Sequence, residues 1–207
     1  MSKKVTIILI AGGTASGKTT VAHRLANEIL KDKSVTHISM DNYYKDFSEL
    51  TFDERKKINF DHPNSVDVEM LTNDLTALLD YQPIKVPIYD FKTSARTEEF
   101  ITYKPSDVVI LDGIFTLAIK DIRKFGDIKI FIKTEDDLRF IRRLQRDMIE
   151  RDRTIESVIH QYLTEVKPMH DTFIGSSIEY ADLIVPYKEG NEVAIDLVAT
   201  KISSLLS

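Results

Sequence analysis

The residues from Gly12 to Thr19 have the types and spacing of a phosphate-binding loop, G-x-x-x-x-G-K-[ST]. Glycines let the backbone curl so that amide N–H groups point at phosphate oxygens, and Lys18 reaches the β- and γ-phosphates. The Thr19 hydroxyl is a ligand for the accompanying Mg²⁺. We therefore predict a nucleoside triphosphate site formed by Gly12, Gly13, Thr14, Ala15, Ser16, Gly17, Lys18, Thr19 and Thr20.

A second magnesium ligand is predicted at Asp112, which follows the apolar run at residues 108–111. In P-loop enzymes a carboxylate at the carboxyl end of a buried strand holds Mg²⁺, directly or through water. Strands also end in Asp-Gly turns that hold no metal. Because a phosphate-binding loop is present in the same chain, we favour the metal-binding interpretation.

Asp41 follows another apolar run, at residues 35–39, and is expected at the carboxyl end of a strand beside that of the phosphate-binding loop. A carboxylate there can accept the proton of an attacking hydroxyl, as the catalytic aspartates of kinases do. It can equally cap the turn into Asn42. The residues alone leave both interpretations open.

Arginines recur along one predicted helix and just after it. Guanidinium groups at such a spacing can clamp a transferred phosphoryl group. The same residues also fit ion pairs one helical turn apart, such as Arg143 with Asp147. The pattern favours ion pairing for most of them and a functional role for two or three. The arginines are Arg139, Arg142, Arg143, Arg146, Arg151 and Arg153.

A framework of buried strands and amphipathic helices must position these residues. Nearly continuous apolar runs predict strands at residues 5–10, 35–39, 108–111, 128–132 and 183–185. Helical periodicity is present at residues 18–30, 66–79, 136–151, 154–173 and 192–206. This alternation predicts an α/β domain around a parallel sheet, with ligands at the carboxyl ends of the strands.

One segment departs from this alternation. Residues 84–90 and 98–103 read as two exposed strands joined by residues 91–97, which predicts a β-hairpin inserted at about residues 84–104. Such a hairpin can cover a ligand site. Rings and carboxylates gather at residues 59–63 and 87–91, where they can stack on a flat ligand and accept hydrogen bonds from sugar hydroxyls. Each cluster alone is more typical of core and turn.

Composition limits the classes of function. The chain has 207 residues, which suits one domain over 1–207, and its net charge of −5 gives no basic field for nucleic acid. The absence of cysteine excludes disulfides, thiolate metal sites and a cysteine nucleophile, and it fits the cytoplasm. No apolar run reaches membrane length, and the N-terminal one is too short for a signal peptide. The histidines show no metal-ligand spacing, and His62 and His170 are assigned no chemistry.

Longer stretches resemble the uridine kinase (uridine–cytidine kinase) family along nearly the whole chain. They are AGGTASGKTT, MDNYYKD, NFDHPNSVDVEML, VPIYDF, VVILDGIFTL, residues 129–174, YADLIVP and NEVAIDL. NFDHP, PIYDF and the block that contains RRLQRD and KPMH are more specific than the phosphate-binding loop. The resemblance implies a P-loop NTPase fold with a mostly parallel five-stranded sheet, the inserted hairpin and a helical lid over about residues 139–165.

The resemblance also implies an activity and roles for single residues. Such enzymes transfer a phosphoryl group from ATP or GTP to the 5′-hydroxyl of uridine or cytidine in pyrimidine salvage, and they are typically homotetramers. Asp41 matches the catalytic base and acts with Lys18, while Thr19 and Asp112 match the magnesium ligands. Arg146 and Arg151 match lid residues near the phosphates. The matching substrate-binding residues are Tyr44, Asp61, Tyr89, Ser94, Arg143, Arg153 and Gln161.

The chain departs from the family pattern at three positions. Ser94 stands where a histidine usually helps to read the base, so the preference between uridine and cytidine is expected to depend on this residue. Asp152 replaces the glycine of the usual ERGR sequence in the lid, which changes backbone freedom and adds a negative charge. Asp112 is shorter than the glutamate that relatives often carry.

Two other classes of protein are alternatives to a nucleoside kinase. A related P-loop kinase that acts on ribulose 5-phosphate or pantothenate is one, but Tyr44 and Tyr89 favour a flat, uncharged base as acceptor. A nucleotide-dependent switch is the other. Switches that bind GTP usually carry an N-K-x-D motif, which this sequence lacks, and they have no need for an aspartate such as Asp41.

Overall fold

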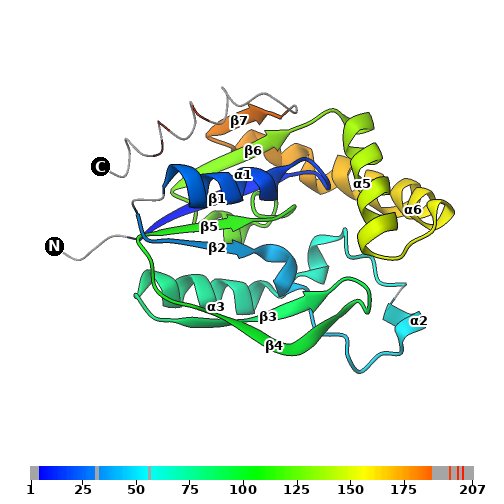
Figure 1. Cartoon of the computed structure of the whole chain (residues 1–207), viewed down its shortest axis with the longest axis horizontal. Coiled ribbons are helices and arrows are strands. Elements are labelled where there is room, and N and C mark those ends of the chain that lie inside the picture. Colours follow the sequence, from blue (N-terminus) through cyan, green and yellow to red (C-terminus); the bar gives the residue numbers. More distant parts are fainter. Residues whose placement is uncertain are drawn as a thin grey trace.

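Strands and helices alternate along the chain as the sequence predicts (Figure 1). The computed structural model describes residues 5–30, 33–55 and 57–187, together with residues 196, 200 and 202. The helix predicted over 192–206 lies outside the described residues apart from those three. Among the helices described, none is both long enough and apolar enough to cross a bilayer.

The strands form two separate sheets. The larger sheet has the order β2-β5-β1-β6-β7 with all neighbours parallel, which confirms the predicted parallel five-stranded sheet. β5 lies between β1 and β2, so the expectation that the strand before Asp41 neighbours the strand of the phosphate-binding loop is wrong. The smaller sheet is the predicted hairpin, an antiparallel pair of β3 and β4. The strands are β1 (Thr6–Gly12), β2 (Val35–Ser39), β3 (Ile84–Asp90), β4 (Ala95–Tyr103), β5 (Val108–Asp112), β6 (Ile128–Lys133) and β7 (Leu183–Pro186).

Helical segments connect the strands. The α-helices are α1 (Lys18–Arg24), α2 (Phe52–Arg55), α3 (Val68–Leu79), α4 (Lys120–Arg123), α5 (Asp136–Glu150), α6 (Ile155–Gln161) and α7 (Lys167–Met169). Short 3₁₀ segments are η2 (Met40–Tyr43), η3 (Pro63–Ser65) and η6 (Ser176–Tyr180), and π segments are η1 (Leu25–Ile29), η4 (Tyr162–Val166) and η5 (His170–Ile174).

The helix predicted over residues 154–173 is divided into α6, η4, α7 and η5. It begins at Thr154, whose hydroxyl accepts a hydrogen bond from the Ser157 amide over 3.2 Å. Pro168 has no N–H to donate to the preceding turn, so regular α-helical bonding is interrupted there. The helical path continues, but as short segments that place His170 in a π turn.

The core lies on both faces of the large sheet. Ile7 and Leu9 of β1 belong to one apolar cluster, with Leu71 of α3, whereas Ile8 belongs to a second cluster with Val21 of α1. Successive residues of a strand point to opposite faces, so the two clusters lie on opposite sides of the sheet. Burial on both faces explains why these strands are apolar at nearly every position.

The hairpin turn is shorter than predicted. The second strand was expected to begin at residue 98, but β4 begins at Ala95. The Asp90 carboxylate accepts hydrogen bonds from the Lys92 amide over 2.9 Å and from the Thr93 hydroxyl over 2.8 Å, which closes a tight turn. Ser94 completes this turn with φ 53°, in the left-handed region.

The carboxyl ends of the parallel strands meet at one edge of the molecule. In Figure 1 the arrowheads of β2, β5 and β6 point toward the side that carries α5, α6 and α2. The turn of the hairpin lies at this side as well. The fold therefore gathers the ends of strands, the lid helices and the hairpin turn around a single region.

Candidate active site

The phosphate-binding loop joins β1 to α1 at this edge of the sheet. It closes on itself through the Ser16 amide, which donates to the carbonyl oxygen of Gly13 over 3.1 Å. Gly17 has φ 90° directly before α1, a left-handed conformation that favours glycine. The Ser16 hydroxyl is buried and has no hydrogen-bond partner among the described residues. A phosphate oxygen bound in the loop would satisfy this hydroxyl.

The two predicted magnesium ligands lie side by side. The Thr19 hydroxyl donates to Asp112 Oδ2 over 2.6 Å, and His37 Nε2 lies 3.0 Å from Asp112 Oδ1. Burial alone would raise the pKa of Asp112, but the hydrogen bond with His37 and the charge of Lys18 outweigh it and hold the pKa below its ordinary value. An ionised carboxylate beside a hydroxyl supplies the oxygen ligands that Mg²⁺ prefers.

This pair does not form a metal site by itself. Within the part of the chain that the structure describes, no three His, Cys, Asp or Glu side chains are grouped to hold a metal. Mg²⁺ in enzymes that use nucleotides typically takes one or two protein ligands and completes its shell with phosphates and water. The geometry of Thr19 and Asp112 therefore fits Mg²⁺ that arrives with a nucleotide.

Asp41 lies in η2, directly after β2, and lines the same cavity as Lys18. The turn here is capped by Ser39, whose hydroxyl accepts from the Asp41 amide over 3.4 Å. Burial raises the pKa of the Asp41 carboxyl, and although Lys18 counteracts this effect, Asp112 adds to it. A carboxylate with a raised pKa is a stronger proton acceptor once it is ionised.

One cavity brings the predicted catalytic and acceptor-side residues together. It holds about 580 Å³ of empty space, counting the part that is open to solvent. All the predicted catalytic, substrate-binding and lid residues line it, whereas of the remaining loop residues only Thr14 does. The lining residues are Thr14, Lys18, Asp41, Tyr44, Phe60, Asp61, Tyr89, Phe91, Ser94, Ile114, Arg143, Arg146, Arg151, Arg153 and Gln161.

Aromatic rings form one wall of this cavity. Tyr44 and Tyr89 lie 5.1 Å apart between ring centroids, and Phe91 packs against Tyr89 at 5.2 Å. Phe60 completes the group, 5.4 Å from Tyr44 and 5.9 Å from Tyr89. Burial raises the pKa of both tyrosines, so they remain neutral phenols at physiological pH. This wall is suited to a flat, uncharged ring.

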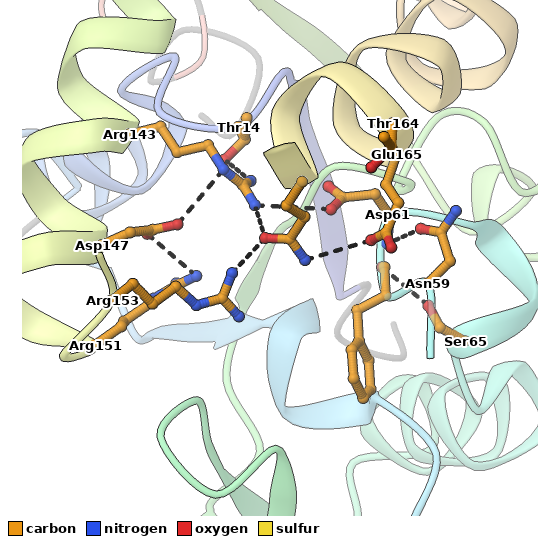
Figure 2. A network of polar contacts seen from close by, with 12 residues as sticks. Thr14, Asn59, Asp61, Ser65, Arg143, Asp147, Arg151, Arg153, Thr164 and Glu165 are labelled. Atoms are coloured by element: carbon orange, nitrogen blue, oxygen red, sulfur yellow. Dashed lines mark hydrogen bonds and ion pairs between the residues drawn. The ribbon is translucent and has the colours of Figure 1, made fainter. Parts of the chain in front are cut away.

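Polar groups that line the same cavity are held in a network (Figure 2). Arg143 donates to the Thr14 hydroxyl over 3.0 Å and to Gln161 Oε1 over 2.9 Å, and it lies 3.8 Å from the Asp61 carboxylate. Arg153 donates to the same oxygen of Gln161. The phosphate-binding loop is thus connected through Arg143 to the side chains predicted to bind the acceptor.

Asp147 is the centre of the arginine cluster. It is fully buried and lies within 3.4 Å of Arg143 Nε, 2.7 Å of Arg146 Nη2 and 3.5 Å of Arg151 Nη1. Burial would raise its pKa, but the charges of the three arginines reverse this and lower it. The pairing expected between Arg143 and Asp147 is therefore present, and the same arginines also line the cavity.

The hairpin turn and the lid meet over the cavity. Lys92 Nζ lies 2.7 Å from the Asp152 carboxylate in the connection from α5 to α6, and the Arg151 guanidinium lies 3.8 Å from the centre of the Phe91 ring. Asp152 has φ 53°, where a glycine would be free of strain. Ser94 is buried and lines the same cavity as Tyr89.

Sequence reasoning missed four residues of this site. Phe60, Phe91 and Ile114 line the cavity. Only Phe60 and Phe91 had a signal in the sequence, because they belong to the ring-and-carboxylate clusters at residues 59–63 and 87–91. His37 approaches Asp112 because β2 pairs with β5, with Ser39 opposite Asp112. No spacing in the sequence reveals this approach, because 75 residues separate His37 from Asp112.

Comparisons with known proteins agree with this geometry. The sequence model of the Phosphoribulokinase / Uridine kinase family matches residues 7–194. The chain is 47% identical to the uridine kinase of Lactobacillus johnsonii over 206 residues, covering 100% of this chain and 98% of the relative. It is 48% identical to the uridine kinase of Staphylococcus aureus strain JH9 over 208 residues, covering 99% of each. The solved phosphoribulokinase from Rhodobacter spheroides, at 13% identity, shares the fold with a TM-score of 0.64 over 92% of this chain and 74% of that one.

Proposed function

We propose that this chain, which belongs to the phosphoribulokinase and uridine kinase family, phosphorylates the 5′-hydroxyl of uridine, cytidine or both with ATP or GTP. The observation that carries this proposal is the single cavity in which Lys18 and Asp41 face the aromatic wall and the Asp61–Arg143 network. A donor site and an acceptor site with those chemistries are what a nucleoside kinase requires.

The acceptor side is proposed to hold the nucleoside. The base lies against Tyr44 and Tyr89, while the Asp61 carboxylate accepts hydrogen bonds from the ribose hydroxyls. Arg143 and Arg153, which share Gln161, fix the position of the sugar and base. Ser94 is placed at the edge of the base, where its hydroxyl can both donate and accept a hydrogen bond.

Phosphoryl transfer is proposed to proceed in line. The Asp41 carboxylate accepts the proton of the 5′-hydroxyl as that oxygen bonds to the γ-phosphorus, and the bond to the oxygen bridging the β- and γ-phosphates breaks to leave the nucleoside diphosphate. Lys18, Arg146 and Arg151 neutralise charge on the transferred group. Mg²⁺, held by Thr19 and Asp112, would add charge neutralisation at the β- and γ-phosphates.

A substrate panel tests the proposal. Uridine, cytidine, adenosine, ribulose 5-phosphate and pantothenate are each incubated with the enzyme, Mg²⁺ and either ATP or GTP, and the phosphorylated product is quantified. We expect the pyrimidine ribonucleosides to react, and 2′-deoxyuridine to react poorly because Asp61 loses one hydroxyl partner. If no pyrimidine nucleoside is phosphorylated while another acceptor is, the assignment of the acceptor is wrong.

Three broader features belong to the same proposal. We propose a homotetramer, which light scattering after gel filtration would detect as a mass about four times that of the chain. We propose a role in pyrimidine salvage, which growth of a pyrimidine auxotroph on uridine or cytidine would test. We also propose a cytoplasmic location, which fits the absence of cysteine and can be tested by cell fractionation.

A further inference from the structure

A second cavity lies on the other side of the phosphate-binding loop. Its walls are Gly13 of the loop, the end of β6, Arg139 of α5 and His170 of η5, around about 560 Å³ of empty space that includes open solvent. None of these side chains takes part in the chemistry proposed above. They nevertheless surround the backbone of the loop that is proposed to hold the nucleotide.

Arg139 is in direct contact with that backbone. Its side chain is only 3% exposed, and its Nη1 donates to the carbonyl oxygen of Thr14 over 3.5 Å. A Cβ atom built on Gly13 would overlap the guanidinium, so the loop rests on Arg139 at this point. A buried arginine is stable only with partners, and Nη2 has two: Asp136 Oδ1 at 2.6 Å and His170 Nε2 at 3.2 Å.

The contact with His170 has only one chemically consistent form. Arginine can donate but not accept, so Nε2 of His170 must accept and the ring must be neutral. The surroundings agree, because burial and the charge of Arg139 lower the pKa of His170 to about 4, despite Asp136 and Asp171 nearby. The remaining proton is then on Nδ1, which is buried without a hydrogen-bond partner among the described residues.

The position of Arg139 matters for the loop because of the peptide that follows Thr14. A trans peptide points its C=O and its N–H in opposite directions, so the bond from Arg139 to the Thr14 carbonyl turns the Ala15 N–H to the other side of the loop. Ala15 itself has φ 57°, a conformation that is strained for a residue with a Cβ. Such a conformation persists only where its surroundings hold it.

We infer that His170 is a positioning residue for the phosphate-binding loop. Together with Asp136 it holds the Arg139 guanidinium against Gly13 and Thr14, and Arg139 in turn fixes the peptide that presents the Ala15 amide to the phosphates. This inference rests on the proposed binding of a nucleotide by the loop and not on the identity of the acceptor. His170 acts on the donor half of the site, and it lines the second cavity, not the one with the aromatic wall.

The test compares His170→Leu with His170→Gln, which keeps a hydrogen-bond acceptor. Titration calorimetry with ADP and Mg²⁺ measures the affinity for nucleotide, and a parallel titration with uridine measures the affinity for nucleoside. We expect His170→Leu to weaken ADP binding about tenfold, the size expected for losing a hydrogen bond to a charged group, with uridine binding changed less than twofold. His170→Gln should recover most of the loss, and His160→Gln, at an exposed histidine of α6, should behave as wild type.

Unchanged ADP binding in a folded His170→Leu protein, or equal losses for ADP and uridine, would overturn the inference. If His170→Leu does not fold, Arg139→Lys decides, because a lysine keeps the charge but cannot contact Thr14, Asp136 and His170 at once. A selective loss of ADP affinity in that variant supports the inference, and an equal loss for both ligands or no loss overturns it. ADP titration needs no acceptor, so failure of the proposed nucleoside kinase activity would be seen separately in the substrate panel.

Discussion

Asp41 is the residue on which the proposed chemistry depends most directly. Asp41→Asn keeps the shape of the side chain but removes the proton acceptor, so we expect kcat to fall by about 10²- to 10⁴-fold. Affinity for ADP with Mg²⁺ should be unchanged, since Lys18 and the loop remain. The exposed Asp46→Asn on the same segment serves as the control. Turnover near that of wild type would show that Asp41 is not the base.

Ser94 is the residue at which discrimination between bases is expected. Ser94 is buried and lines the cavity beside Tyr89, so Ser94→Ala removes a donor and an acceptor without enlarging the side chain. We expect KM for uridine and cytidine to rise about three- to tenfold, the range for one neutral hydrogen bond, with kcat changed less than twofold. A change in kcat alone would show that Ser94 does not contact the bound base.

His170 also makes a prediction about stability at acid pH. Its pKa in the folded protein is lowered to about 4, whereas in the unfolded chain it is near 6.5. The unfolded state therefore takes up a proton first, and the folded protein loses stability as pH falls from about 6.5 to about 4. Between these pH values the melting temperature of wild type should fall more than that of His170→Gln. Parallel melting curves for the two proteins would contradict the assignment of a neutral ring.

The element that depends most on a single side chain is the end of α5. Asp147 is fully buried and faces three arginines, so Asp147→Asn removes a carboxylate that compensates their charges. Because Arg146 and Arg151 are partly exposed, we expect the free energy of unfolding to fall by about 2 kcal/mol, less than for a fully buried pair. Denaturant titration measures this change. Asp137→Asn, at the exposed start of the same helix, should change it by less than about 0.5 kcal/mol.

The contact between the hairpin turn and the lid predicts a dependence on salt. Lys92 and Asp152 are 56% and 71% exposed, so their attraction is weak and easily screened. We expect KM for the nucleoside to rise about two- to fivefold between low and high salt in wild type, and less in Asp152→Asn, because asparagine tolerates the left-handed backbone but carries no charge. In the double variant of Asp152→Asn with Lys92→Gln, the second substitution should cause no further change in the salt dependence of KM. Equal salt dependence in all three proteins would show that the bridge does not control access to the cavity.

Much of the whole fold is predictable from sequence because its central strands are buried on both faces. Residues 108–111 and 128–132 are apolar almost throughout, a pattern that few other environments produce. The start of β4 was placed wrongly because the turn is closed by the Asp90 side chain, and its length is not coded by periodicity. The predicted acceptor residues come together because the strand ends, the hairpin and α5 converge at one edge.

What could not be predicted is contact between residues distant in the chain. His37 reaches Asp112 through strand pairing. His170 reaches Arg139 from the helix predicted over residues 154–173, which is divided into short segments around Pro168. In both cases a histidine contacts a charged residue, Asp112 or Arg139, that is a candidate from the sequence alone. The residues that act on a ligand carry recognisable types and spacing, whereas the residues that hold them in place do not.

Thr14 has a consequence for the whole enzyme because it belongs to both halves of the site. Its carbonyl is held by Arg139 on the donor side and its hydroxyl by Arg143 on the acceptor side. Two ligands that share such a residue are thermodynamically linked, and the factor by which ADP changes the dissociation constant for uridine must equal the factor by which uridine changes that for ADP. In Thr14→Val, which lacks the hydroxyl, this factor should move toward one. Binding of either substrate would then cease to affect how tightly the other is held.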